Sequence, residues 1–255
     1  MHGPAPQTTC LGVRLDAITM RGAVDRCAEW CRDPAATRIV FPVNASIVVA
    51  MQTDLALRAA CDAADMRLAD GASLLWATRL EGGRLPERVA GIDLMQRLIE
   101  RAAADRLSLF FLGARPVVVK RLVEQCRSLY PDVRIAGFRD GYFDRAEESS
   151  LVQSIRASGA DILFIGMPTP FKEIWANTFR DQLGVRLILG VGGSFDVVAG
   201  FIPRSPLWLQ RAGMEWLWRL LREPRRLWRR YMFTNTSFIV LVLTSAIKRT
   251  FRLRA

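Results

Sequence analysis

The stretch "LSLFFLGARPVVVKRLVEQCRSLYPDVRIAG", residues 107–137, has the pattern of one strand, one helix and a second strand. An apolar run over 107–112 ends at a glycine, and an amphipathic pattern that opens close to a proline follows over 116–129. A second apolar run covers 133–137. Two strands joined by a single helix run parallel, so this segment predicts an α/β fold.

The same alternation continues on both sides of that segment. Further strands are expected at 38–43, 66–69, 161–165 and 185–189, and further helices at 54–64, 91–104, 146–157 and 171–183. The connections are mostly short, and no internal repeat or low-complexity linker interrupts them. The sequence therefore predicts a mostly parallel sheet with helices on both faces.

Charge divides the 255-residue chain into two parts. Residues 204–255 hold twelve Lys or Arg against two Asp or Glu, which leaves 24 basic and 23 acidic residues for 1–203. A nearly neutral body of this size can bury a proper core. We therefore expect an α/β domain over 1–203 and a basic helical appendage over 204–255.

The cysteines and the single histidine limit the chemistry. Five cysteines lie in apolar patterns of a chain without a secretory signal, so we expect reduced, mostly buried thiols in a cytoplasmic protein. The only histidine is His2, and no Cys or His spacing suits zinc. No Asp-x-Asp pair and no glycine-rich phosphate-loop motif is present. The sequence predicts no metal and no cofactor, and a carboxylate, lysine or tyrosine as any general base.

Asp70 lies where the predicted strand at 66–69 meets a helix-like segment. Open α/β sheets bind ligands at this carboxyl edge, so Asp70 is a candidate for proton transfer. Capping of the following helix is the alternative role. Downstream, Arg88 lies in "EGGRLPERVAG", a segment too polar to be core, and is a candidate for anion binding.

Three predicted strands end in glycine-containing sequences: "FLGA" at 111–114, "IGMPTPFKE" at 165–173 and "GVGGSFD" at 190–196. Glycine lets backbone N–H groups approach an anion at a helix N-terminus, and it also serves tight turns. None of the three is a Gly-x-Gly-x-x-Gly fingerprint. Together with Asp70 they indicate a nucleotide-type crevice.

The segment "WLQRAGMEWLWRLLREPRRLWRRY", residues 208–231, is basic and amphipathic, with Pro224 expected to break or kink it. It holds four of the seven tryptophans. This pattern suits an anionic membrane surface, although a helix packed on the body fits it too. Residues 231–247 carry no charge but are short for a span, so they are expected to lie on the membrane. No nucleic-acid motif accompanies the arginines, so no nucleic-acid partner is expected.

Five segments together resemble one family. They are "FPVNASIVVAM", "DAADMRLADGASLLWATRLEGGRLPERVAGIDLM", "GYFD", "GVGGSFDVVAG" and "GMEWLWRLLREPRRLWRRY", and they occur in order over nearly the whole chain after Cys10. They are similar to the WecG/TagA/CpsF glycosyltransferases, bacterial enzymes of cell-surface polysaccharide synthesis. The resemblance implies a Rossmann-like core and an inverting, metal-independent transfer from a UDP-sugar to a polyprenyl-diphosphate-linked saccharide. It also implies peripheral attachment at the cytoplasmic face of the cell membrane, with an appendage that completes the active site.

The resemblance implies roles for single residues as well. Asp70 matches the proposed catalytic base, Arg88 a binding arginine and Asn44 a donor-site asparagine. The tail arginines thought to meet the lipid diphosphate are Arg219, Arg226 and Arg229. The remaining candidates for substrate binding, including stabilisation of the departing UDP, are Lys172, Gly192, Gly193 and Asp196.

Two positions depart from the family pattern. Many members read Thr-Pro-Asn where this chain has "PVN" at 42–44, and Pro-Lys-Gln-Glu where it has "PFKE" at 170–173. A hydroxyl and an amide able to bond the donor are thus replaced by Pro42 and Lys172. N-acetylmannosamine, its uronic acid and glucose therefore all stay open as the donor sugar.

Two other function classes stay open. A Rossmann-type oxidoreductase predicts a Gly-x-Gly-x-x-Gly after the first strand and an acid about 20 residues further on, which the sequence lacks. A membrane-docked nucleotide-binding module predicts nucleotide affinity that survives a change of Asp70, without turnover. The sequence also leaves open whether copies of the chain form a homo-oligomer.

Overall fold

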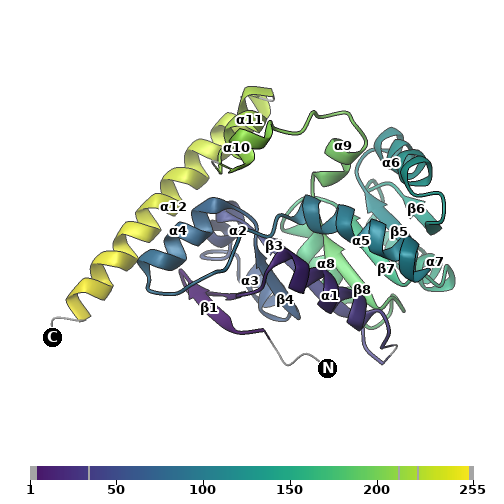
Figure 1. The fold of residues 1–255 in the computed structure, drawn as a ribbon, viewed down its shortest axis with the longest axis horizontal. Helices are drawn as coiled ribbons and strands as arrows, with labels where there is room; N and C mark the ends of the chain where they lie inside the picture. Colours follow the sequence, from purple (N-terminus) through teal and green to yellow (C-terminus); the bar gives the residue numbers. More distant parts are fainter. Residues whose placement is uncertain (1–4, 34, 212, 223, 253–255) are drawn as a thin grey trace.

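The computed structural model describes residues 5–33, 35–211, 213–222 and 224–252, without the side chains at 211, 219, 226, 227, 230, 231 and 248–252. Its centre is a six-stranded parallel sheet (Figure 1). The strands, in order across the sheet, are β4 (Met66–Ala69), β3 (Arg38–Val43), β8 (Leu187–Gly190), β7 (Ile162–Gly166), β5 (Ser108–Gly113) and β6 (Arg134–Arg139). The predicted α/β fold is confirmed, and every strand of this sheet lies within two residues of its expected range.

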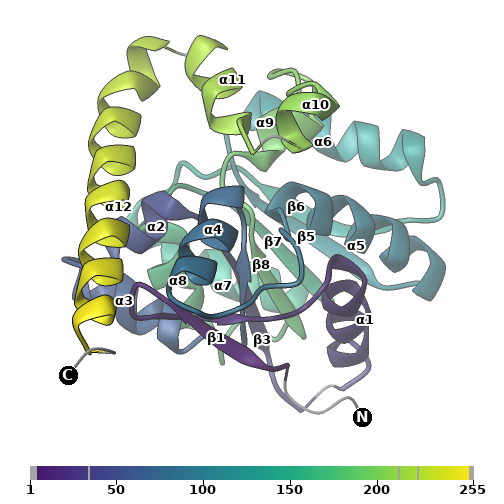
Figure 2. The ribbon, with the colours of Figure 1, turned by 60° about the vertical axis from the view of Figure 1, so that its left-hand side comes forward.

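Helices cover both faces of the sheet, as the view in Figure 2 also shows. One core lies under α1 (Met20–Trp30), α5 (Gly91–Asp105), α6 (Pro116–Leu129) and α9 (Ser194–Val198). The other lies under α2 (Ala45–Ala50), α3 (Leu55–Asp62), α4 (Ala72–Leu80), α7 (Glu148–Ala157), which follows the short helix η1 (Arg145–Glu147), and α8 (Phe171–Phe179). Buried strand residues alternate between the two cores, so that Phe41 faces one and Val40 the other.

The N-terminal elements were not predicted. β1 (Gln7–Cys10) and β2 (Val13–Asp16) form an antiparallel hairpin whose turn, Leu11 and Gly12, has positive φ at both residues. The Asp16 carboxylate accepts a hydrogen bond of 2.8 Å from the backbone N–H of Arg67, which attaches the hairpin to β4. The strands are only four residues each, too short to give a clear period-two pattern.

The chain ends in three helices, α10 (Leu207–Arg211), α11 (Glu215–Arg222) and α12 (Pro224–Arg252). The break expected at Pro224 is confirmed. A second break was not expected: the helical pattern is interrupted at Gly213, where φ is 71° and a Cβ would lie 2.4 Å from the Cβ of Ala72. Close packing on the body thus ends the helix there. Further on, α12 buries Phe238 and Val242 in the core beneath α2, so one face of 231–247 packs on the body.

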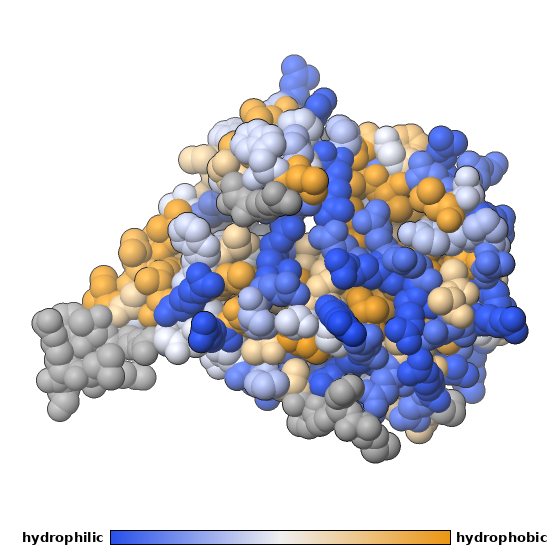
Figure 3. Space-filling model, in the orientation of Figure 1, coloured by the Kyte–Doolittle hydropathy of each residue, from blue (hydrophilic) through white to orange (hydrophobic). Residues whose placement is uncertain are grey.

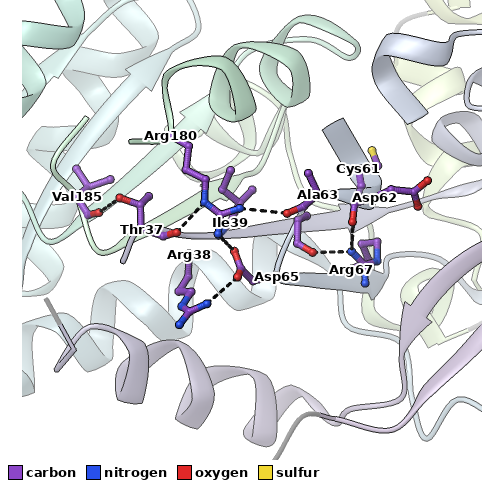
Figure 4. A network of polar contacts seen from close by, with 11 residues as sticks. Thr37, Arg38, Ile39, Cys61, Asp62, Ala63, Asp65, Arg67, Arg180 and Val185 are labelled. Atoms are coloured by element: carbon purple, nitrogen blue, oxygen red, sulfur yellow. Dashed lines mark hydrogen bonds and ion pairs between the residues drawn. The ribbon is translucent and has the colours of Figure 1, made fainter. Parts of the chain in front are cut away.

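The amino ends of the strands are joined by a saturated polar network (Figure 4). The Asp65 carboxylate, just before β4, accepts bonds from Arg38 Nη1 at 3.0 Å, from the backbone N–H of Ile39 at 2.8 Å and from Arg180. Arg180 also donates to the carbonyl oxygens of Thr37 and Ala63. Arg180 directly follows α8, which ends at Phe179, earlier than the helix expected over 171–183.

Candidate active site

The carboxyl ends of β3, β4 and β8 lie side by side, since β3 pairs with both neighbours. Asn44 follows β3, Asp70 follows β4, and the turn with Gly192 follows β8. The Asp70 backbone N–H donates to the carbonyl oxygen of Val43 at 2.7 Å. The sheet therefore brings three of the predicted site segments to one edge, where ligands of open α/β sheets bind.

The Asp70 side chain contacts α5. The N-cap residue of α4 is Gly71, which has no side chain to cap that helix. The Asp70 Oδ2 atom accepts a bond of 3.3 Å from the backbone N–H of Gly91, the first residue of α5. The Asp70 carboxylate therefore lies half-buried against the start of α5.

Asn44 has a structural bond of its own. Its Oδ1 accepts from the backbone N–H of Ile47 at 3.1 Å and caps α2, which leaves donation from the amide nitrogen as its chemistry toward a ligand. Pro42 lies nearby, beyond Val40, the last residue of β3 that pairs with β8. Pro42 pairs with β4 but has no partner in β8, so a residue without an N–H fits there. Its ring packs where a Cβ at Gly91 would stand 2.8 Å away.

Arg88 contacts an acid that was not among the predicted site residues. Its Nη1 forms an ion pair with Glu215 Oε2, and its Nη2 lies 4.0 Å from Asp93 Oδ2. The Val89 N–H donates to the carbonyl oxygen of Ala69 at 2.9 Å, so Arg88 is held beside the end of β4 and Asp70. Glu215 is 127 residues away in sequence, and the one signal for it is its place as an acid at the start of a basic helical pattern.

A second set of contacts fastens the chain before α11 to α5. Arg204 donates to Asp93 Oδ1 at 2.5 Å and to Gln96 Oε1 at 3.4 Å. The Ser205 hydroxyl donates to Glu215 Oε1 at 3.3 Å. The C-terminal helices therefore reach the start of α5, the same helix end that meets Asp70.

Lys172 is buried. Its Nζ contacts the Thr169 hydroxyl at 2.5 Å and forms an ion pair with Glu173, which is itself fully buried. The positive charge of Lys172 is therefore already compensated. This placement does not support the role expected for Lys172 in stabilising a departing nucleotide, because the Lys172 and Glu173 side chains are only 6% and 0% exposed and a ligand cannot reach them. By contrast, the paired Arg88 and Glu215 side chains are 19% and 26% exposed.

The glycine turn after β8 is tight. Gly192 has a φ of 53°, and Gly193 precedes α9, a helix of only five residues. The Asp196 carboxylate lies 3.7 Å from Arg115 Nη2, at the start of α6. Gly192 and Gly193 thus belong to the edge that carries Asp70, whereas Asp196 pairs with an arginine of another helix.

The tail arginines are only partly described. The side chains of Arg219 and Arg226 lie outside the described residues. Arg229 is exposed, and its guanidinium carbon lies 5.4 Å from the centre of the Trp228 ring. Such stacking of an arginine on an exposed tryptophan keeps both cationic and apolar groups at one surface.

α12 exposes a broad apolar surface on the side away from α2 (Figure 3). The residues more than half exposed on this helix, which we call the α12 apolar stripe, are Met232, Phe233, Ile239, Val240, Leu243 and Ile247. Trp76 and Leu80 of α4, which packs against α12, are exposed as well. No helix in the described part of the chain has the length and apolarity to cross a bilayer. Contiguous apolar surface of this kind marks an interaction site.

Thiols and metal ligands do not gather at this edge. The five cysteines are free and buried, as expected from the sequence. Across 5–252, apart from the undescribed positions, no group of three or more His, Cys, Asp or Glu residues is arranged to hold a metal ion. The polar groups of the site are therefore carboxylates, arginines, an amide and backbone N–H groups.

Comparison with known proteins agrees with this geometry. The chain is 29% identical over 213 residues to the N-acetylglucosaminyldiphosphoundecaprenol N-acetyl-beta-D-mannosaminyltransferase of Bacillus subtilis (strain 168), a match that covers 84% of this chain and 82% of the relative. The profile of the glycosyl transferase WecG/TagA/CpsF family matches residues 8–252. The chain is therefore a glycosyltransferase and belongs to the WecG/TagA/CpsF family.

Proposed function

We propose that this enzyme transfers a hexose or N-acetylhexosamine from a UDP-sugar to a polyprenyl-diphosphate-linked saccharide in cell-surface polysaccharide synthesis. The observation that carries the proposal is the Asp70 carboxylate at the start of α5, beside Arg88. The name of the Bacillus subtilis relative, a transferase onto a sugar-diphosphate-undecaprenol, supports the acceptor class.

Asp70 is the general base of the proposed reaction. The acceptor hydroxyl attacks the anomeric carbon, its proton passes to the Asp70 carboxylate, and the bond to the UDP oxygen breaks. General base catalysis of this kind contributes about 10² to 10⁴-fold. A single displacement inverts the anomeric centre, so an α-linked nucleotide sugar gives a β product, as in the relative's name. Arg88 and the backbone N–H of Gly193 stabilise the departing diphosphate, without a metal, while the Gly192 N–H donates to the carbonyl oxygen of Ile165 and holds the turn.

The donor pocket is proposed at the ends of β3 and β8, with the Asn44 amide nitrogen as a donor-binding group. Pro42 lies where many relatives have threonine, so this chain binds the donor sugar with one hydroxyl fewer. UDP-N-acetylmannosamine, its uronic acid and UDP-glucose are the donors to compare, because the family resemblance leaves all three open.

Residues 204–255 act, in this proposal, as an appendage that binds the cytoplasmic face of the membrane and completes the site. The basic charge of that segment and the α12 apolar stripe support attachment to an anionic bilayer, which gains apolar burial and roughly 1 kcal/mol per Lys or Arg at the surface. Arg219, Arg226 and Arg229 are proposed to meet the acceptor diphosphate.

The test is a panel of UDP-sugars, each incubated with a lipid-diphosphate-linked sugar acceptor, with UDP release as the readout. We expect release with one donor above all others, unchanged by EDTA, and a β-linked product by NMR. A chain that binds UDP but releases none with any pair would be a binding module. Loss of turnover in EDTA would remove the metal-independent mechanism.

A further inference from the structure

The Val89 bond to Ala69 places Arg88 beside the end of β4, where Asp70 follows, so whatever fixes the Arg88 guanidinium affects the site. The hydrogen bond from the Val89 N–H to the carbonyl oxygen of Ala69 holds the Arg88 backbone at the end of β4. The long arginine side chain can still adopt several rotamers unless a contact with another residue fixes one of them. The Arg88 side chain is only 19% exposed. A partner at the tip therefore decides where the charge is aimed.

Glu215 is that partner, and its own orientation is fixed twice. One carboxylate oxygen pairs with Arg88, while the other accepts from the hydroxyl of Ser205, which is buried. Glu215 is also the first residue of α11, where the helix dipole favours a negative charge. A carboxylate with both oxygens engaged holds a guanidinium in one geometry better than a mobile surface acid does.

The surrounding charges give Arg88 a second partner if Glu215 is removed. Asp93 lies 4.0 Å from Arg88 Nη2 and already binds Arg204. Without Glu215, the Arg88 side chain would turn toward Asp93 and α5. Gly213, two residues before Glu215, packs against Ala72 just after the Asp70 turn, so this stretch of chain is closely fitted to the site.

We propose that Glu215 is a positioning residue of the glycosyl transfer: its carboxylate aims the Arg88 guanidinium at the substrate diphosphate. This inference rests on the proposed function, in which Arg88 binds a diphosphate. It adds an acid of the C-terminal helices to the site.

A double-mutant cycle tests the coupling. With the donor and acceptor that the UDP-release panel identifies, Glu215→Gln should raise the KM for the diphosphate substrate about tenfold, and kcat should fall less than about threefold because Asp70 is untouched. In the Arg88→Ala background the same change should alter KM by less than about twofold. Equal effects in both backgrounds, or no effect in either, would overturn the proposal. Glu215→Asp, which keeps the charge on a shorter arm, should recover part of the lost KM.

A matched control separates positioning from simple loosening of the helix. Trp218→Phe removes the bond of 3.0 Å from the indole Nε1 to the carbonyl oxygen of Pro203, which anchors α11 without touching Arg88. Its kinetic constants should stay within about twofold of wild type. A Trp218→Phe enzyme with the same KM defect as Glu215→Gln would show that any loosening of α11 suffices, and would refute a specific role for Glu215.

Amide hydrogen exchange of the full-length proteins supplies a readout without substrate. Glu215→Gln should speed exchange in 86–90 and in 213–218 together, whereas Trp218→Phe should leave 86–90 at wild-type rates. Unchanged exchange at 86–90 in Glu215→Gln would overturn the claim that Glu215 holds Arg88. This arm stands even if the wild-type chain turns over no substrate, an outcome that refutes the proposed function instead.

Discussion

The two ends of the parallel strands use the same residue types in different ways. At the amino edge, Asp65 and Asp161 each accept a short bond from the backbone N–H that opens a neighbouring strand, Ile39 at 2.8 Å and Ser108 at 2.7 Å, and each also binds an arginine. At the carboxyl edge, Asp70 accepts a longer bond of 3.3 Å from Gly91. The acids at the amino edge are saturated by strong donors, which is the arrangement expected of structural groups.

The arginines at the two edges also differ in which part of the chain binds them. Arg180 donates to three partners within the body, two of them backbone carbonyls that the fold already fixes. Arg88 is paired with Glu215, which comes from the C-terminal helices. A charge held by a separate segment can respond to a ligand or to displacement of that segment. The comparison supports a structural role for the amino edge and is consistent with the site proposed at the carboxyl edge together with α11.

The largest effect is expected from the tail arginines. Arg219→Ala, Arg226→Ala and Arg229→Ala combined should reduce turnover on a short-chain, water-soluble acceptor on the order of 10³-fold, since each is proposed to bind the acceptor diphosphate through a bond to a charged group. The full-length triple variant keeps Phe238 and Val242 of α12 in the core, which a truncation would remove.

The matched control for the triple variant removes the same charge from the exposed body residues Arg21, Arg121 and Arg145. Its turnover on the soluble acceptor should be near wild type. Liposome pelleting of the tail variant should weaken and should depend on salt and on anionic lipid. Full turnover by the tail variant would leave the C-terminal helices as an anchor only.

The second prediction concerns stability at the amino edge. Asp65→Ala removes the shared partner of two arginines and of the Ile39 N–H, so the free energy of unfolding should fall by about 3 kcal/mol in urea titrations. Asp25→Ala, at an acid that is 47% exposed and paired with Arg21 and Arg101, should cost less than about 1 kcal/mol. Equal losses from the two variants would contradict the structural role of the edge.

The third prediction concerns Arg88. Arg88→Ala should lower kcat/KM by about 1.5 to 3 kcal/mol, the scale of a hydrogen bond to a charged group, with little change in the free energy of unfolding. Arg84, an exposed arginine of the same loop, is the control, and Arg84→Ala should keep wild-type kinetics. Unchanged kinetics in Arg88→Ala would exclude it from substrate binding.

The smallest effect is expected from the thiols, which serve neither edge. Burial raises the pKa of Cys31, Cys61 and Cys126 to about 12 and that of Cys10 to about 11. Iodoacetamide at pH 8 should therefore leave turnover unchanged, while urea-unfolded protein should label readily. Because these pKa values are higher in the folded than in the unfolded chain, the thiols contribute fully to the free energy of unfolding below pH 9. That contribution falls as the pH rises toward 11, since the unfolded thiols ionise first. Rapid inactivation of the folded enzyme at pH 8 would contradict this.

Much of the fold was predictable from local patterns. The strands β5, β7 and β8 are nearly continuous apolar runs, and Pro116 marks the start of α6 closely. The hairpin of β1 and β2 was not predictable, because its strands are short and half of their residues face solvent. The break at Gly213 depends on packing against Ala72, a tertiary contact that the helical periodicity of the sequence does not reveal.

The site residues that stand at strand ends were predictable from the sequence. The ion pairs between residues of different elements were not. Asp70 stands at a strand end, so its place at the edge follows from sequence order alone. The pairing of Arg88 with Glu215, and of Lys172 with a buried Glu173, depends on tertiary contacts. The burial of Lys172 was not predicted, because Lys172 occupies a position that the family resemblance led us to expect at the donor.

The most direct test of the central claim, that Asp70 is the general base, is the turnover number of Asp70→Asn with the best donor and acceptor. The account predicts a kcat lowered by roughly 10² or more, with UDP affinity and the free energy of unfolding close to wild type. Asp65→Asn at the opposite edge should show the reverse, lower stability with kcat nearly unchanged. Near wild-type turnover in Asp70→Asn would contradict the account and remove Asp70 from the mechanism.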